Sequence, residues 1–345
     1  MRAGGWHTAR VCEIDRVELA ASGARALAWV GGELYDVAAG WTHYPLDGSP
    51  PRRRYSGYGP GFDTALVAPA GDIVALLCGT GTKGLLFDPG GDLVREVNRS
   101  YYHADAYRYP LALFSLPDGR TGVVHCPEDY HRLEIDDART GQRLTAAATR
   151  EPQDFFHSRL AVSPSGRYLL SAGWVWHPWG CLVVFHLHVA LEQPQTLDAV
   201  EGDLFGMRGL VQAEISGACF IGDDVVVSTS AEPNEPDGPD DLAPNMLARW
   251  STTQARFLWR HQLEETAGDL LSIGNSVLGL YRHPRLYDAD TGQVQTQWPD
   301  LDTGQAASSI VWGKGFSGPA RVAVDQPGRR FAVTDGERIV VVHLG

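Results

Sequence analysis

One pattern recurs seven times along this chain: two short β-type runs flank a tight turn, and a third, apolar run follows. The clearest copy covers residues 160–171, with Pro164-Ser165-Gly166 at the turn and the apolar run at 181–185. Glycine adopts the positive φ of such turns without steric cost, so the two runs are expected to form an antiparallel hairpin. A repeat of this kind predicts small sheets that bury their faces against the next copy.

The seven turns carry glycine at comparable distances along the chain. These glycines are spaced 39 to 56 residues apart and are Gly32, Gly71, Gly119, Gly166, Gly222, Gly274 and Gly328. A four-stranded propeller blade takes about 40 to 50 residues, so the intervals fit blades with loop insertions. We therefore predict an all-β, seven-bladed β-propeller, with six or eight blades as the alternatives. Capped stretches of helical periodicity are not evident, which argues against a parallel α/β fold.

The two ends of the chain complement each other. The seventh unit, residues 319–345, stops after its third strand, whereas residues 9–19 alternate like a strand before the first hairpin begins. If residues 9–19 supply the missing outer strand, the ring closes through hydrogen bonds and no open sheet edge is left there. We therefore expect residues 1–345 to form a single β-propeller domain in which 9–19 complete the last blade.

Several strand and turn motifs resemble those of the WD40-like β-propeller superfamily. They are Ser163-Pro-Ser-Gly166, Leu116-Pro-Asp-Gly119, Tyr287-Asp-Ala-Asp-Thr-Gly292 and Glu134-Ile-Asp-Asp-Ala-Arg-Thr-Gly141. The resemblance extends over nearly the whole chain, but the Gly-His and Trp-Asp dipeptides of that family are missing, as in a divergent, bacterial-type member. The resemblance implies a binding platform more often than an enzyme, and it transfers no catalytic residue.

Charge and cysteine content narrow the expected partners. The net charge is −13 and the only dense basic run is Arg52 to Arg54, which argues against nucleic acid and anionic membranes as partners. No stretch approaches the roughly 18 apolar residues of a membrane span, and residues 1–16 have no apolar targeting core. The five cysteines are odd in number and form no CxxC pair, which favours small buried side chains. We expect a cytoplasmic protein.

Strand order determines which loops share a face of the propeller. With strands a to d counted outward from the axis, the d-to-a and b-to-c connections of antiparallel blades lie on one face, which we call the loop face. The long connections of this chain belong to it and are 57–61, 78–83, 100–109, 125–131, 151–157, 174–179, 232–241, 282–285 and 302–319. Loops on a rigid scaffold often carry function, so we expect the site here.

Six of the 12 histidines fall in the loops of this face, namely His103, His125, His131, His157, His177 and His283. Neutral imidazoles from neighbouring loops can hold a divalent metal or act as acid and base near pH 7. The candidate metal ligands and candidate catalytic residues are His103, His125, His157 and His177. The sequence has no HxxxH or HExxH spacing, so separately solvated histidines are the alternative. His186 and His188 are expected on one side of a strand, packing between blades.

Aromatic residues and arginines gather in the same loops, and these side chains are favoured at recognition surfaces. The candidate ligand-binding residues are Tyr58, Tyr102, Tyr107, Arg108, Tyr130, Trp176, Arg282, Arg285 and Trp312. The leading hypothesis is a platform that binds a protein, peptide or small molecule on the loop face of blades two to four and six. The alternative is an enzyme with a His-rich site there, with or without a metal ion, in which Arg108 or Arg282 neutralises an anionic or peptide substrate. The sequence specifies neither the ligand nor the oligomeric state.

Overall fold

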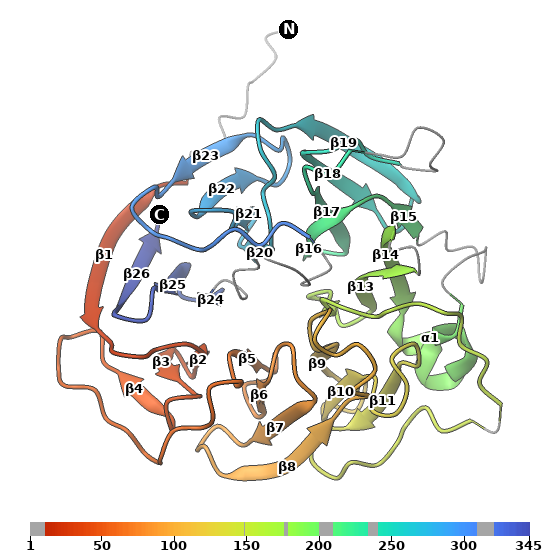
Figure 1. Cartoon of the computed structure of the whole chain (residues 1–345), viewed down its shortest axis with the longest axis horizontal. Helices are drawn as coiled ribbons and strands as arrows, with labels where there is room; N and C mark the ends of the chain where they lie inside the picture. The colour runs from red at the N-terminus through yellow and green to blue at the C-terminus, as the bar shows by residue number, and fades with distance from the viewer. Residues whose placement is uncertain (1–10, 148, 176–178, 200–209, 234–240, 309–320) are drawn as a thin grey trace, which may run out of the picture.

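In the described part of the chain, seven antiparallel sheets surround a common axis (Figure 1). The computed structural model describes residues 11–147, 149–175, 179–199, 210–233, 241–308 and 321–345, with only the backbone of Trp179 and Leu210. Each sheet is one blade, and in blades one to six the strands follow one another in sequence. The predicted seven-bladed β-propeller is confirmed.

Blades one to four comprise strands β2 to β15. From the axis outward they are β2 (Leu27–Val30), β3 (Glu33–Asp36) and β4 (Thr42–Tyr44); β5 (Thr64–Val67), β6 (Val74–Leu77), β7 (Lys83–Phe87) and β8 (Leu93–Asn98); β9 (Leu111–Ser115), β10 (Thr121–His125) and β11 (Glu134–Asp137); and β12 (Ala161–Val162), β13 (Tyr168–Val175), β14 (Trp179–His186) and β15 (Leu210–Gln212). In place of a fourth strand, single bridges join His43 to Arg52 in blade one and Asp136 to Arg143 in blade three. Two prolines precede Arg52 and cannot donate to a ladder, which explains the short pairing in blade one.

Blades five to seven each have four strands. They are β16 (Ile215–Ile221), β17 (Asp224–Thr229), β18 (Met246–Ser251) and β19 (Arg256–Gln262); β20 (Leu270–Ile273), β21 (Ser276–Gly279), β22 (Arg285–Asp288) and β23 (Val294–Gln297); and β24 (Val322–Asp325), β25 (Arg330–Thr334), β26 (Arg338–Leu344) and β1 (Glu13–Ala20). β1 pairs with β26 from Glu13 opposite Leu344 to Ala20 opposite Arg338. Figure 1 shows β1 as the outer strand beside β26, so the predicted closure of the ring is confirmed.

Glycine has a positive φ at six of the seven predicted hairpin turns, which is the conformation that the sequence pattern requires there. The seventh turn differs. Gly328 is not in the left-handed region, and Arg329 adopts a φ of 47° instead. An added Cβ at Gly328 would overlap the carboxylate of Asp325, so glycine is needed there for close approach and not for its φ.

The hydrophobic core is divided among the seams between neighbouring blades. One cluster joins Leu170 of blade four to Phe220 of blade five, and another joins Leu34 of blade one to Val341 of blade seven. Because both faces of a blade are covered in this way, second strands can be buried along their whole length, as every residue of β6 and β10 is. The seams form the rigid frame on which the loops are mounted.

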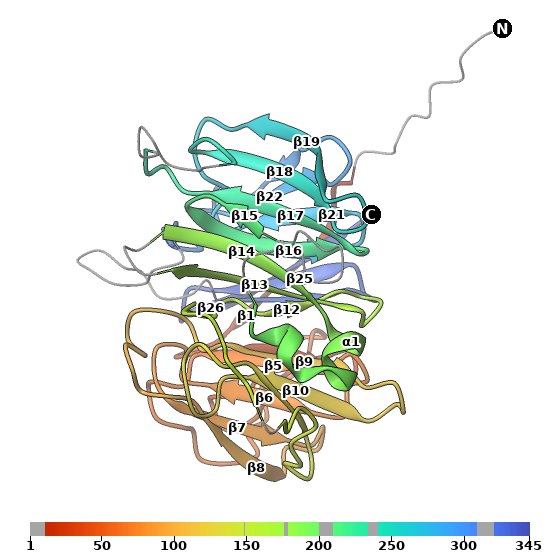
Figure 2. The ribbon, with the colours of Figure 1, turned by 90° about the vertical axis from the view of Figure 1, so that its right-hand side faces the viewer.

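A short helix interrupts the strand pattern of blade four. α1 (Leu187–Glu192) begins directly after His186, and the 3-10 helix η1 (Pro194–Leu197) follows it. The expectation that His186 and His188 alternate on a strand is therefore wrong: β14 loses its partner after the His186–Tyr168 pair, and the chain turns into the helix. Figure 2 shows α1 near the edge of the propeller in side view. No helix of the described residues is long and apolar enough to cross a membrane.

Candidate functional site

Three connections around blade three bring four aromatic rings into one stack, which we call the aromatic stack. Trp174 lies on Phe156 with ring centroids 3.7 Å apart, Phe156 on Tyr130 at 4.2 Å, and Tyr130 on Tyr102 at 5.0 Å. Trp174 and Phe156 are buried, whereas Tyr102 is 48% exposed. The stack therefore runs from the interior of the propeller to solvent.

Backbone pairing fixes the inner end of the stack. Phe156 and Trp174 exchange two backbone hydrogen bonds, of 2.9 and 3.3 Å, which tie the connection between blades three and four to β13. An added Cβ at Gly173 would overlap the carbonyl oxygen of Phe156, so only glycine permits this approach. Tyr107 is fully buried and meets Phe156 edge-on, with ring centroids 5.5 Å apart. Tyr107 therefore supports the stack from within.

Buried Arg99, next to the end of β8, organises the loop that carries Tyr102. Its guanidinium donates to the carbonyl oxygens of Gly81 at 2.7 Å, Ala104 at 2.5 Å and Tyr107 at 3.0 Å. The same guanidinium lies over the Tyr107 ring, 4.5 Å from its centroid. Three carbonyls from two connections converge on one side chain, so this loop has a defined conformation.

Tyr130 and Tyr102 form the outer end of the aromatic stack. The Tyr130 hydroxyl donates to Asp154 at 2.6 Å. Burial and this hydrogen bond raise the pKa of Tyr130, so the phenol stays neutral and keeps donating at physiological pH. Tyr101, beside Tyr102, is 87% exposed. Tyr102 is thus presented to solvent on a base of packed rings, with exposed Tyr101 next to it in sequence.

The candidate histidines of the described residues do not converge on a point. His125 and His157 are both buried, His125 with Nε2 3.0 Å from Asp136 and His157 with Nδ1 3.1 Å from Ser171. Burial lowers the pKa of His157 to about 3, so its ring is neutral at pH 7. His103 belongs to a different setting, at the outer end of the stack with its ring 4.5 Å from that of Tyr102.

The predicted metal site requires several ligand side chains close to one another. Among the described residues, no three His, Cys, Asp or Glu side chains are arranged so that they could hold a metal ion. His177, the fourth candidate, lies outside the described residues, as do the candidate ligand residues Trp176 and Trp312.

The remaining candidate ligand residues lie apart from the stack. Tyr58 packs between blades one and two, with its ring centroid 5.7 Å from that of Phe87. In blade six, Arg282 pairs with Glu265 at 3.1 Å, and Arg285 pairs with the same carboxylate. Arg108 faces the axis of the propeller. The structure thus groups Tyr102, Tyr107 and Tyr130, and it separates them from Tyr58 and from the arginines of blade six.

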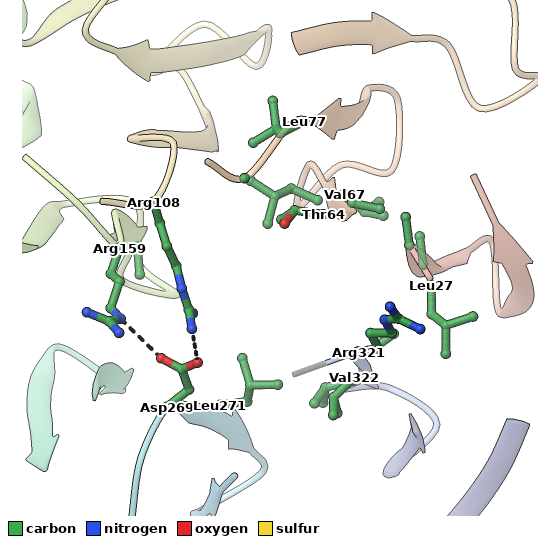
Figure 3. Close-up of a pocket in the computed structure, with 18 of the residues that line it drawn as sticks. Leu27, Thr64, Val67, Leu77, Arg108, Arg159, Asp269, Leu271, Arg321 and Val322 are labelled. Atoms are coloured by element: carbon green, nitrogen blue, oxygen red, sulfur yellow. Dashed lines mark hydrogen bonds and ion pairs between the residues drawn. The ribbon is translucent and has the colours of Figure 1, made fainter. Parts of the chain in front are cut away.

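A cavity of about 470 Å³ lies on the propeller axis, lined by residues from all seven blades (Figure 3). We call it the central channel. Its walls are largely apolar, with leucine and valine side chains such as Leu27, Val67 and Leu271. Within the part of the chain that the structure describes, its charged lining residues are Arg25, Asp63, Arg108, Arg159, Asp269 and Arg321.

The six charged residues occupy one structural position. Each precedes the innermost strand of its blade by one to three residues, as Arg25 does before β2 and Asp269 before β20. Because d-to-a connections end there, all six lie at the loop-face end of the channel. Sequence reasoning singled out only Arg108. Aligning the repeats on their first strands would have revealed the others, since this position is charged in one unit after another.

Asp269 joins two of the channel arginines. Its carboxylate accepts from Arg108 Nη2 at 2.5 Å and from Arg159 Nε at 3.1 Å (Figure 3). Burial alone would raise the pKa of Asp269, but the charges of Arg108 and Arg159 outweigh it and lower the pKa. Burial and the charge of Arg108 lower the pKa of Arg159 to about 10, so Arg159 is still charged at pH 7. The three residues together carry one net positive charge.

Comparison with known proteins identifies the fold. No protein-family model matches the chain, and no curated protein matches it. Among solved structures, a chain from the crystal structure of a mitotic checkpoint complex matches with a TM-score of 0.59, over 99% of this chain and 95% of that one. The likeness extends over the whole fold, which is a seven-bladed β-propeller. This confirms the resemblance that the turn motifs indicated.

The similarity to the checkpoint-complex chain concerns the fold alone. Sequence identity to the checkpoint-complex chain is 9%, too low to carry over the role of any residue. In total, 845 chains of solved structures match, and a scaffold so widely used does not select one function. The features of this chain that can indicate its function are the aromatic stack and the central channel.

Proposed function

We propose that this WD40-like propeller is a binding platform that recognises a protein or peptide on its loop face, at the aromatic stack. The observation that carries the proposal is the contrast along the stack: its inner rings, Trp174 and Phe156, are buried, while its outer ring, Tyr102, is 48% exposed, and the neighbouring Tyr101 is 87% exposed. Aromatic side chains already held by packing lose little conformational freedom on binding, and they dominate the energy of many interfaces.

A macromolecular partner suits this surface better than a small ligand. The stack residues do not line the central channel, and exposed rings on a surface offer contact area without enclosing a ligand. The similar solved structure is that of a complex, which agrees with a protein partner. Because the net charge is −13, the proposed partners do not include nucleic acid or anionic membranes.

We also propose that the protein is located in the cytoplasm, because all five cysteines are free.

The enzyme alternative has less support among the described residues. Of its four acid–base candidates, His125 and His157 are buried, and each is held by a side chain of a neighbouring strand, Asp136 and Ser171. His103 is half-buried against Tyr102, and His177 lies outside the described residues. A general base must reach the proton that it abstracts, and a ring without exposed surface does not meet a substrate. We therefore keep the binding platform as the proposed function.

Selection of peptides from a random displayed library against the folded protein tests the proposal. Selected peptides are then titrated against Tyr102→Ala and against the control Tyr55→Ala. Tyr55 is also exposed, at 37%, but lies outside the stack. We expect Tyr102→Ala to weaken binding about tenfold or more, as loss of an aromatic anchor does, and Tyr55→Ala to leave it unchanged. Peptides that bind both variants equally well would place the binding surface elsewhere.

A further inference from the structure

The central channel concentrates positive charge within an acidic molecule. The whole chain has a net charge of −13. Among the described residues at the loop-face end of the channel, four arginines face two aspartates, which leaves these six side chains with a surplus of two positive charges. Low-dielectric walls focus the field of such a group and attract ions of the opposite sign.

Two of the four arginines have no carboxylate partner within the described chain. Arg25 donates to backbone carbonyl oxygens, including those of Phe62 at 2.9 Å and Gly59 at 3.2 Å. Arg321 Nη1 donates to the carbonyl of Ala24 at 3.5 Å. Neutral carbonyl groups orient a guanidinium but do not neutralise its charge. Arg25 and Arg321 therefore contribute to the surplus of positive charge in the channel.

The other positive group is the pair formed by Arg108 and Arg159, which share the single carboxylate of Asp269. Arg108 Nε and Arg159 Nη1 are buried and make no hydrogen bond in the described part of the chain. Asp269 therefore neutralises only one of the two guanidinium charges, and it leaves N–H groups of both arginines without an acceptor among the described residues. Figure 3 shows this group on one side of the channel and Arg321 on the other, with apolar side chains around the space between them.

We propose that the loop-face end of the central channel binds a small organic dianion with its charges at the two ends, a linear dicarboxylate. One carboxylate meets Arg108 and Arg159, and the other meets Arg321 and Arg25. The hydrocarbon chain lies against the leucine and valine walls. Arginine is the side chain best suited to carboxylates, which it can bind through two parallel hydrogen bonds.

The dimensions of the channel and its separation from the stack agree with this ligand. Its volume of about 470 Å³ falls in the range of small-molecule sites, about 300 to 1,000 Å³. A compact dianion such as phosphate reaches only one of the two arginine groups at a time and should bind more weakly. Because the aromatic stack does not line the channel, the site is independent of the protein partner proposed above.

Isothermal titration calorimetry on the full chain tests the proposal. The probes are linear dicarboxylates from succinate to suberate, inorganic phosphate, and 1,6-hexanediol as an uncharged analogue of adipate. We expect one dicarboxylate to bind with a stoichiometry of one and more tightly than phosphate, and hexanediol not to bind. Affinity should fall as salt is added. Absence of dicarboxylate binding, tighter binding of phosphate, or equal binding of hexanediol would overturn the proposal.

Two substitutions that change the charge of the channel lining in opposite directions then locate the binding site. Arg321→Gln, at an exposed position, should weaken dicarboxylate binding about tenfold through loss of a charged hydrogen bond. Asp63→Asn keeps an acceptor for the Gly79 amide, raises the lining charge by one, and should tighten binding severalfold. The control Arg256→Gln, an exposed residue of β19, should change nothing.

The pattern across these variants decides the outcome. Equal affinities in the wild type, Arg321→Gln and Asp63→Asn would place the ligand outside the channel, and equal losses in Arg321→Gln and Arg256→Gln would reveal general attraction to charge. Either result overturns the site. Thermal unfolding without ligand verifies that each variant is folded.

Discussion

Burial gives His125 of blade three and His157, next to blade four, a structural setting. His125 binds Asp136, which also accepts from Arg143 at 2.6 Å. Burial alone would raise the pKa of Asp136, but His125 and Arg143 outweigh it and lower the pKa. His157 is likewise held by Ser171 on β13. Both histidines join a loop or strand end to its own blade, so we assign them a structural role.

The buried, neutral state of His157 predicts a pH-dependent stability. Its folded-state pKa of about 3 lies below the unfolded value of about 6.5. The unfolded chain therefore binds more protons, so the stability due to the neutral ring is complete above pH 6.5 and is lost as pH falls towards 3. Between pH 7.5 and pH 5 the wild type should lose about 2 kcal/mol of unfolding free energy through this residue.

Denaturant unfolding at the two pH values measures this loss. His157→Gln should lack it, whereas the control His261→Gln, on the outer strand β19, should retain it. Wild type and His157→Gln with the same pH dependence would mean that the ring is protonated in the folded state.

The sequence places these histidines in loops of one face, but it cannot tell which of them are buried. Spacing within one connection is local information, whereas the burial of His157 depends on β13 and on the connections packed over it. The same limit applies to Tyr107, which belongs to a loop and yet is fully buried behind Phe156. The sequence therefore predicted that histidines and aromatic residues gather on the loop face. It did not predict which of their rings make contact.

At the scale of elements, hairpins were the easiest feature to predict, because a tight turn and its flanking apolar runs are adjacent in sequence. The helix α1 was missed, since it starts where the pairing of β14 with β13 ends, and that depends on the length of a partner strand. The missing outer strand of blade three was also unforeseen. There, buried Glu134 of β11 binds Arg132 at 2.7 Å and Arg150 at 3.3 Å, so ion pairs cover an edge where a fourth strand was expected.

Gly173 of β13 tests how the strand supports the aromatic stack. Gly173→Ala would force its new methyl group into the Phe156 carbonyl, so the connection that carries Phe156 has to move. We expect a loss of about 2 to 3 kcal/mol in unfolding free energy, typical of overpacking, and a weaker near-UV circular dichroism signal from the stacked rings. Gly59→Ala is the matched control, since nothing lies within 4 Å of its added Cβ. Equal effects of the two substitutions would argue against close support by β13.

At the scale of the whole molecule, closure of the ring and the charged end of the channel both follow from the radial order of the strands. Closure was predictable because the C-terminal unit shows three strands of a blade and the N-terminal segment shows one. The ring of charged residues was not, because residues as distant in sequence as Arg25 and Arg321 approach each other only when the blades surround one axis. Residues at the same position of successive repeats lie on a ring around the propeller axis. Aligning the repeats on their first strands therefore locates the channel site.

Circular permutation tests the closure itself. The Gly345 amide donates to the Cys12 carbonyl at 3.0 Å, so a short linker from Gly345 to Val11 would turn β26 and β1 into an ordinary hairpin. A permutant that starts at Gly23 and ends at Ser22 keeps every strand, and its melting temperature should stay within a few degrees of the wild type. Deletion of residues 1–22 instead uncovers the edge of β26 and should lower the melting temperature further and promote association, measured by thermal circular dichroism and size-exclusion chromatography. A deletion variant as stable and monodisperse as the permutant would mean that the seams between blades, and not the β1–β26 ladder, hold the ring closed.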